Sequence, residues 1–380
     1  MLDSSYLQAS EAAALAWGVP ALAFGVSVGG TVETASVGCD PSTRFRVASI
    51  TKPVTAALAV ELLDLEASTG IWPADVRVRH LLSHTSGFDC ELTGIDQVRF
   101  DSADDPLEAQ LPALESVRRW VGVEQCWSYG NAGYWLAGAL AGRAAASSYE
   151  DAVASRILRP LGLESSSFGE PEVPGTGADA AEGGYPRART PSGGLVSNVP
   201  DLLRFGQHLL AEPRLRILHG KPVGGVYGLG LYGERVGGVE VWGHPGSWGG
   251  YQSALLFVPE RDAVFVGLTN GSLGRKAVYE LADEFFQRLL GARRSVPETV
   301  DLPDDARQAF SGSYANSDDS YEVSFASDGL SVKLEDGEFA ARPIGERTFE
   351  ITEGDHVRER FDFPLDGFGR FSSRLAERVS

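Results

Sequence analysis

Alternating runs of apolar and polar residues occur in two separate parts of the first 290 residues. Residues 21–38 read ALAFGVSVGGTVETASVG, two β-rich runs separated by Gly29-Gly30, and this pattern predicts a hairpin. Between 225 and 270, four further short runs divided by turn residues predict strands: VYGLGLYG, VEVWGHPG, YQSALLFVP and AVFVGLTN. If both groups of strands share one sheet, the segments between them can form a separate helical lobe.

Helical periodicity fills the region between these strands. We expect an apolar helix within 46–66 and a short one within 75–92 that breaks at Gly87. A Gly-rich turn near 190 leads into an amphipathic helix that has Pro200 in its first turn. A last helix is predicted at 277–290. The pattern therefore predicts an α/β protein of the α+β type.

The pattern changes near the last quarter of the chain. Residues 292–307 are polar and contain prolines, as interdomain linkers often do. After them come short alternating strands separated by Asp, Gly and Asn turns, which predict a small all-β, barrel-like domain. We therefore expect a first domain at 1–295, a linker at 296–306 and an antiparallel β domain at 307–380.

The composition excludes several classes of partner. The 380 residues are 43% hydrophobic and 22% charged, as in ordered globular proteins. The net charge is −19 and no basic run is present, which argues against nucleic acid and against anionic membrane surfaces as partners. No apolar run is long enough to span a bilayer, and the N-terminus shows no signal peptide. A cytoplasmic location is expected.

Neither a disulfide framework nor a metal site is expected. Cys39, Cys90 and Cys126 are few and scattered, and they lack the paired spacing of a structural zinc site. His80 and His84 are four residues apart, but HLLSH lacks the glutamate of the zinc-binding H-E-x-x-H pattern. We expect His84 to tie its helix to a backbone carbonyl, and we expect no cofactor.

The stretch Ser49-Ile50-Thr51-Lys52 opens the first apolar helix. A serine and a lysine three residues apart lie on the same helical face, within reach of one another. A serine hydroxyl needs an adjacent base to act as a nucleophile, and lysine can serve when burial and positive potential lower its pKa. An isolated pair of this kind is more often a helix cap beside a solvated lysine, so other motifs have to decide.

A second stretch, SYGNAGYWLAGAL at 128–140, precedes another apolar helix. Tyr129 can hold or release a proton beside a lysine, and Asn131 offers both a donor and an acceptor to an amide substrate. Each residue alone would be read as an ordinary packed tyrosine or turn asparagine.

A third stretch, GHPGSWGGY at 243–251, ends a predicted strand. Gly246 allows the backbone to approach a ligand closely, and the N–H of Ser247 could complete an oxyanion hole with that of Ser49. His244 is a candidate cationic or hydrogen-bonding group across the pocket.

Ser-x-x-Lys, Tyr-x-Asn and His-x-Gly, in this order, resemble the motifs of the penicillin-recognising serine hydrolases, which include class C β-lactamases, DD-peptidases, D-aminopeptidases and related esterases. The likeness runs over roughly residues 10–290, and LLSHTSG (81–87) and PSGGLVSNVPDLLRF (191–205) support it. It implies a five-stranded antiparallel sheet flanked by helices, with an all-helical lobe beside it and the active site between them. The C-terminal strands resemble, less specifically, the lipocalin-like β module of some relatives.

The resemblance also implies a role for each motif. Ser49 would attack a carbonyl while Lys52 and Tyr129 transfer protons. The backbone N–H groups of Ser49 and Ser247 would hold the oxyanion, and Asn131 would orient the substrate. Water would then hydrolyse the acyl-enzyme.

The third motif departs from the β-lactamase pattern. Those enzymes usually have Lys-Thr-Gly where this chain has His244-Pro245-Gly246, so the lysine charge and the threonine hydroxyl that helps bind a substrate carboxylate are both missing. An esterase, or a peptidase or amidase acting on a small D-amino-acid ester or amide, is therefore favoured, with a small molecule or short peptide as substrate. Two alternatives stay open: β-lactamase or DD-carboxypeptidase activity, and a catalytically inert ligand-binding member of the fold.

Overall fold

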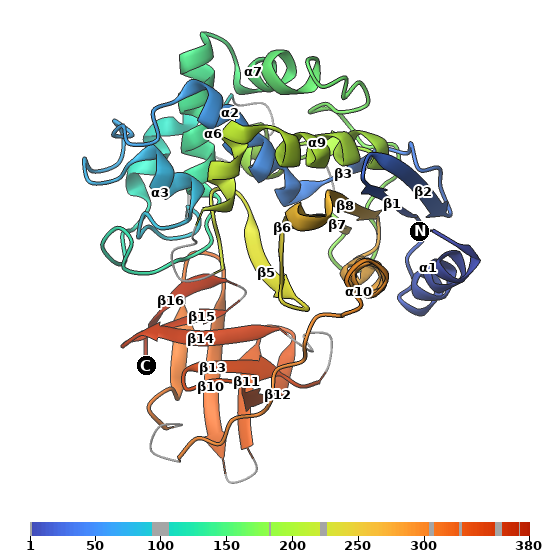
Figure 1. The fold of residues 1–380 in the computed structure, drawn as a ribbon. Helices are drawn as coiled ribbons and strands as arrows, with labels where there is room; N and C mark the ends of the chain where they lie inside the picture. Colours follow the sequence, from blue (N-terminus) through green and yellow to red (C-terminus); the bar gives the residue numbers. More distant parts are fainter. Residues whose placement is uncertain are drawn as a thin grey trace.

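The computed structural model describes residues 2–92, 106–181, 184–220, 226–303, 308–326, 329–353, 359–371 and 373–380. Its central element is a six-stranded antiparallel sheet in the order β2-β1-β8-β7-β6-β5 (Figure 1). In that order the strands are Thr31–Val37, Leu22–Val28, Ala263–Thr269, Tyr251–Val258, Val239–Trp248 and Tyr232–Val236. The hairpin at Gly29-Gly30 is confirmed, and the two groups of strands do share one sheet, because β1 pairs with β8 along its whole length.

The sheet has one strand more than the five that the family resemblance implied. The additional strand β5 lies at the edge and pairs with β6 from Tyr232 to Val236. The strand predicted in VYGLGLYG begins only at Tyr232, because Gly230 has a φ of +82° and the N–H of Gly228 donates to Leu231 O at 2.8 Å. These features turn the GLGL segment back on itself, so it cannot extend as a strand.

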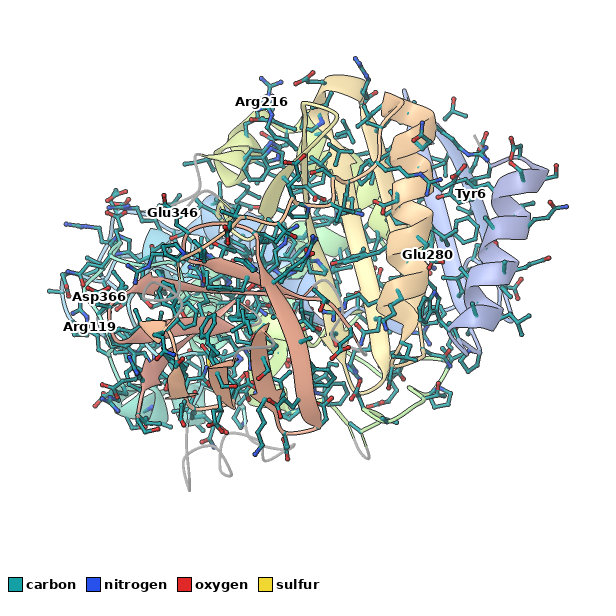
Figure 2. All side chains as sticks on the ribbon, turned by 90° about the horizontal axis from the view of Figure 1, so that it is seen from below. Tyr6, Arg119, Arg216, Glu280, Glu346 and Asp366 are labelled. Carbon is teal, nitrogen blue, oxygen red and sulfur yellow. The ribbon has the colours of Figure 1, made fainter. Side chains whose placement is uncertain are left out.

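Helices cover both faces of the sheet. On one face α1 (Ser4–Ala16) packs beside α10 (Gly274–Leu290), where the Tyr6 hydroxyl donates to Leu281 O at 2.5 Å (Figure 2). On the other face lies α9 (Val199–Ala211), which has Pro200 in its first turn as predicted. Alternate residues of β7 and β8 point to the two faces, so the sheet separates two apolar cores.

The helical lobe joins the core on the α9 side of the sheet (Figure 1). Its helices are α2 (Thr51–Leu62), α3 (Val78–Leu82), α5 (Leu107–Gln110), α6 (Ala132–Ala145), α7 (Tyr149–Val153) and α8 (Thr190–Gly193). The short helix expected to reach Gly87 is α3, and it ends at Leu82 because His84 adopts a φ of +58°. Among the helices of the described ranges, none is long and apolar enough to cross a membrane.

The C-terminal strands close into an eight-stranded barrel in the order β10-β11-β12-β13-β14-β15-β16-β9. From β9 to β16 they span Gly312–Ala315, Ser320–Ala326, Gly329–Leu334, Gly337–Pro343, Thr348–Ile351, Arg360–Leu365, Phe368–Phe371 and Arg374–Arg378. Aromatic side chains, among them Phe349, Phe361 and Phe363, fill its interior. The preceding segment packs against the barrel, because Leu302 is buried in this core and the Val300 N–H donates to Pro343 O at 2.9 Å.

Candidate active site

Ser49 lies on a short 3₁₀ turn, η1 (Ala48–Ile50), that runs directly into α2. Ala48 has a φ of +46°, a conformation that a non-glycine residue keeps only when its surroundings hold it there. Those surroundings include Val47, whose carbonyl accepts a hydrogen bond from Ser253 Oγ of β7 at 2.9 Å. The turn that carries Ser49 is therefore fixed against the sheet.

The Lys52 ammonium position is enclosed by three oxygens. Its Nζ lies 3.1 Å from Ser49 Oγ, 2.7 Å from Asn131 Oδ1 and 2.9 Å from the carbonyl oxygen of Ser192, and the side chain is 0% exposed. The oxygens of Asn131 and Ser192 can only accept hydrogen bonds. When the amine is neutral, these two acceptors take its two N–H groups, and its lone pair faces Ser49 Oγ.

The surroundings of Lys52 favour that neutral form. Burial lowers the pKa of Lys52 well below its usual range, and the positive charges of Arg374 and Arg189 lower it further, against the opposing effect of Glu91. A lysine of lowered pKa can act as a base near neutrality. The fold therefore gives Lys52 of the Ser-x-x-Lys motif the lowered pKa that a base near neutral pH needs.

Tyr129 approaches Ser49 from the segment that precedes α6. Its hydroxyl donates to Ser49 Oγ at 3.0 Å, and its ring centroid lies 4.7 Å from Lys52 Nζ. Burial raises the pKa of Tyr129 well above its ordinary value. The phenol therefore keeps its proton at neutral pH, and its role in proton transfer stays a prediction.

Asn131 links Lys52 to Glu91 through two hydrogen bonds. While Asn131 Oδ1 accepts from Lys52, its Nδ2 donates to Glu91 Oε1 at 2.5 Å. The buried Glu91 carboxylate also pairs with Arg189 and, at 3.5 Å, with Arg374 of the barrel. These contacts fix the amide of Asn131 beside the lysine, whereas its role in orienting a substrate stays a prediction.

Gly246 allows strand β6 to lie directly against η1. A Cβ atom at this position would stand 2.2 Å from Val47 O, 2.3 Å from Ser253 Oγ and 3.2 Å from the Ser49 nitrogen. Only glycine tolerates such a close approach. Ser247 follows at the exposed end of the strand, where its Oγ accepts from Gln252 Nε2 at 2.9 Å.

His244 lies among aromatic rings and carries no charge. Its Nε2 is 3.0 Å from the Tyr227 hydroxyl, and its ring centroid is 5.1 Å from that of Tyr232 and 6.0 Å from that of Tyr129. Burial and the Lys52 charge lower the pKa of His244 to about 3. A neutral ring favours the hydrogen-bonding role considered from the sequence over the cationic one, and the role of His244 stays a prediction.

His84 has a structural position, but its hydrogen bond differs from the expected one. Its Nδ1 accepts from the backbone N–H of Gly130 at 3.2 Å, where we had expected a bond to a carbonyl. Burial lowers the pKa of His84 well below its usual range, so the ring is neutral and can accept. Its own carbonyl accepts from the Ser128 N–H at 2.9 Å, so His84 holds the segment on both sides of Tyr129.

Four further residues join the site without any sequence signal that pointed to them. Glu91 lies two residues after Asp89 in a stretch without a recognised motif, and Ser192 contributes through its main-chain carbonyl, which any residue type possesses. Arg189 and Arg374 come from distant parts of the chain, and both pair with Glu91. The stretch PSGG, noted as part of the family resemblance, was the nearest available signal for Ser192.

A model of the Beta-lactamase family matches residues 8–284. The chain belongs to this family. It is accordingly a serine hydrolase, and its first 290 residues carry the family's three motifs in order. Penicillin-binding protein 4 of Amycolatopsis lactamdurans is 27% identical over 316 residues, which cover 69% of this chain and 81% of that protein.

Solved structures with the same fold include SurE in complex with D-Leu, at 23% identity and a TM-score of 0.76, with 99% of each chain covered. The D-amino acid amidase from Ochrobactrum anthropi SV3, complexed with L-phenylalanine, has 21% identity and a TM-score of 0.63 over 75% of this chain and 99% of that one. The first similarity includes the C-terminal barrel, because it spans nearly the whole chain.

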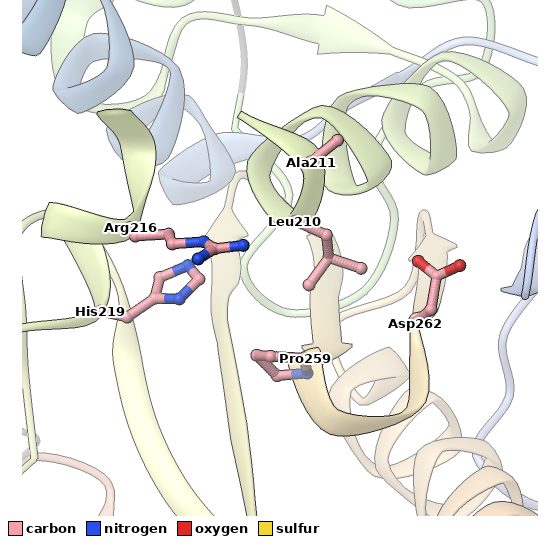
Figure 3. Close-up of a pocket in the computed structure, with 6 residues that line it drawn as sticks. All are labelled: Leu210, Ala211, Arg216, His219, Pro259 and Asp262. Atoms are coloured by element: carbon pink, nitrogen blue, oxygen red, sulfur yellow. The ribbon is translucent and has the colours of Figure 1, made fainter. Parts of the chain in front are cut away.

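A surface hollow of this Beta-lactamase-family chain lies away from Ser49. It measures about 320 Å³ and is lined by Leu210, Ala211, Arg216, His219, Pro259 and Asp262 (Figure 3). The hollow lies at the Val258 end of β7. The turn that carries Ser49 contacts β7 nearer the other end of this strand, through the bond from Ser253 Oγ to Val47 O. Within the described ranges, no group of three or more His, Cys, Asp or Glu side chains is placed to hold a metal ion.

Proposed function

We propose that this chain hydrolyses an ester or amide bond through an acyl-enzyme on Ser49. The observation that carries the proposal is the 3.1 Å contact between Lys52 Nζ and Ser49 Oγ, with the other two Nζ contacts taken by Asn131 and Ser192. Among the residues that the structure describes, this arrangement leaves the serine hydroxyl as the hydrogen-bond partner of the lysine lone pair. A base held in that way activates a serine at neutral pH.

In the proposed reaction, Lys52 takes the Ser49 proton as Oγ forms a bond to the substrate carbonyl carbon. The oxyanion accepts hydrogen bonds from the backbone N–H groups of Ser49 and Ser247. When the bond to the leaving amine or alcohol breaks, the proton on Lys52 passes to that group through the Tyr129 hydroxyl. Water then attacks the carbonyl carbon of the acyl-enzyme while Lys52 takes a proton from it. Lys52 returns this proton to Ser49 Oγ as the bond between Oγ and the acyl carbon breaks, which releases the carboxylic acid and the free serine hydroxyl.

The substrate class that we propose is a small ester or amide of a D-amino acid, or a short peptide that contains one. The neutral His244 supports this class, because it provides no positive charge at the position where β-lactamases usually have lysine. Two proteins of the same fold are named for D-stereospecific chemistry or contain D-Leu. Similarity to a penicillin-binding protein favours β-lactam or DD-carboxypeptidase chemistry as the second candidate.

Intact-protein mass after brief exposure to p-nitrophenyl acetate, a fluorophosphonate probe and a penicillin tests the proposal. We expect one adduct from the ester and from the probe, absent in Ser49→Ala and retained in Ser116→Ala, an exposed serine on another element. Hydrolysis rates of D- and L-alanyl and leucyl p-nitroanilides then test the substrate class.

Each outcome has a defined meaning. An adduct that persists in Ser49→Ala would refute the proposed nucleophile, and no adduct in folded protein would favour the inert alternative. Stable acylation by the penicillin would move the substrate class to the second candidate. Faster cleavage of the L-anilides would overturn the proposed stereochemical preference.

A further inference from the structure

The segment that carries Tyr129 has no secondary structure of its own. Residues 126–130 belong to no helix, strand or turn, and α6 begins only at Ala132. A tyrosine on such a segment keeps its hydroxyl 3.0 Å from Ser49 Oγ only when other parts of the molecule hold the backbone. The contacts around this segment therefore decide the geometry of the reaction centre.

The barrel contacts three successive residues of this segment. Arg370 Nη1 of β15 donates to Trp127 O at 2.6 Å, and the N–H of Leu375 in β16 donates to Ser128 Oγ at 2.9 Å. The N–H of Tyr129 itself donates to the carbonyl of Ser373, in the turn between these two strands, at 2.8 Å. Each bond joins a different residue, so the segment can neither slide nor rotate freely.

The groups that hold the segment are themselves rigid. Arg370 stands opposite Asp362 on the neighbouring strand β14, and its Nε donates to Asp362 Oδ1 at 2.8 Å while Nη2 contacts Oδ2. Such a two-pronged pair fixes the plane of the guanidinium. The same group lies 5.1 Å from the centroid of the Trp127 ring, so it contacts both the side chain and the carbonyl of that residue.

The barrel faces the helical lobe with these same strands. Figure 1 shows β15 and β16 at the edge of the barrel nearest to the lobe. The neighbouring Arg374 of β16 reaches Glu91, beneath Lys52. The contacts to residues 127–129 are thus part of one continuous interface between the barrel and the reaction centre.

We infer that the barrel is a positioning element of the reaction centre, in which the bonds from Arg370 to Trp127 O and from the Leu375 N–H to Ser128 Oγ hold the backbone that sets the Tyr129 hydroxyl beside Ser49. The inference rests on the proposed function, since it assigns importance to Tyr129 in proton transfer. Arg370 touches no reacting atom and acts through Tyr129. The barrel therefore contributes to the rate of acylation.

Loss of these bonds is expected to act on rate. A displacement of a reacting group by 1 Å can reduce the rate by about 100-fold. We expect Arg370→Ala to lower the rate of Ser49 labelling by a fluorophosphonate by about 30-fold, and Ser128→Ala by about 5-fold, because the second removes only one of the three bonds. For ester hydrolysis, kcat should fall while KM changes little.

A double-mutant cycle with Tyr129→Phe tests whether these residues act through the phenol. In the Tyr129→Phe background we expect Arg370→Ala to lower the rate of Ser49 labelling by less than about 3-fold, because there is no longer a hydroxyl group to displace. The matched control is Arg347→Ala, a barrel arginine that bonds Asp366 at 3.0 Å and Phe363 O, both of which belong to the barrel domain. It should keep the full labelling rate. The thermal unfolding midpoint of every variant confirms that it is folded.

The outcomes separate this inference from the proposed function. The positioning role would be refuted if Arg370→Ala lowered the labelling rate equally in the unchanged protein and in Tyr129→Phe. It would also be refuted if Arg370→Ala and Ser128→Ala both kept the full labelling rate. In either case Ser49 would still be labelled, so the proposed function would be unaffected. An unimpaired Tyr129→Phe variant would also overturn the inference. If Arg370→Ala does not fold, Ser128→Ala carries the same cycle. Among the results of this cycle, absence of labelling in the unchanged protein is the one that would count against the proposed function itself.

Discussion

Replacing Gly246 with alanine tests whether strand β6 fixes the turn that carries Ser49. The new methyl carbon would lie 2.2 Å from Val47 O and 2.3 Å from Ser253 Oγ. Carbon–oxygen contacts between neighbouring chains ordinarily lie at about 3.3–3.6 Å. The strand and the turn must therefore separate by about 1 Å. Rotation of Ser253 would relieve only one of the two contacts, and it would break the bond from Ser253 Oγ to Val47 O.

The magnitude follows from that displacement. A 1 Å error in the position of Ser49 is expected to lower kcat/KM by about 100-fold, which corresponds to about 2.7 kcal/mol in activation free energy. Overpacking should also lower the free energy of unfolding by about 1–3 kcal/mol. Steady-state hydrolysis of p-nitrophenyl acetate gives the first quantity, and urea unfolding gives the second.

Gly267→Ala in β8 is the matched control. Its methyl group would meet the Val278 side chain, with Cγ1 at 2.8 Å, on the face of the sheet that packs against α10. We expect this variant to lose stability to a similar extent while kcat/KM stays within about 3-fold of the unchanged protein. If Gly246→Ala also kept kcat/KM within that range, the close approach of β6 would not determine the position of Ser49.

Three further results are expected. Lys52→Met should lower kcat/KM by about 100- to 10,000-fold, the usual range for a general base, in the p-nitrophenyl acetate assay, and a variant with near-normal turnover would exclude Lys52 as the base. The pKa of Lys52 is lower in the folded protein than in the unfolded chain, where it is about 10.4. Between these two pKa values the unfolded chain binds more protons than the folded protein, so the stability of the folded protein falls as the pH falls. The destabilisation caused by burying Lys52 is therefore largest below the folded pKa. The thermal unfolding midpoint of Lys52→Met minus that of the unchanged protein should therefore increase as the pH falls from 10 to 6. A difference that stays constant over this pH range would mean that Lys52 is not desolvated. His244→Gln should leave the shape of the pH–kcat/KM profile between pH 5 and 8 unaltered, since the imidazole with its pKa of about 3 is neutral throughout, and loss of an ionisation from that profile would contradict the assignment.

Local spacing was enough to predict the parts of this protein that depend on neighbours in the chain. The three-residue interval between Ser49 and Lys52 places both on one face of a helical turn, whatever surrounds them. The hairpin at Gly29-Gly30 and the alternating strands of the barrel follow from backbone conformation and the two-residue period in the same way. The edge strand β5 was misplaced because its position depends on pairing with β6 and on the turn at Gly230.

Tertiary structure alone decided the electrostatics of the site and the support of Tyr129. The lowered pKa of Lys52 requires complete burial and the charge of Arg374, which lies in a barrel strand far along the chain. The segment that carries Tyr129 is bonded to Arg370, Leu375 and the carbonyl of Ser373 in the barrel, and to His84 in the helical lobe. Desolvation and long-range hydrogen bonds arise only when distant segments pack together, so no local pattern of residue types encodes them.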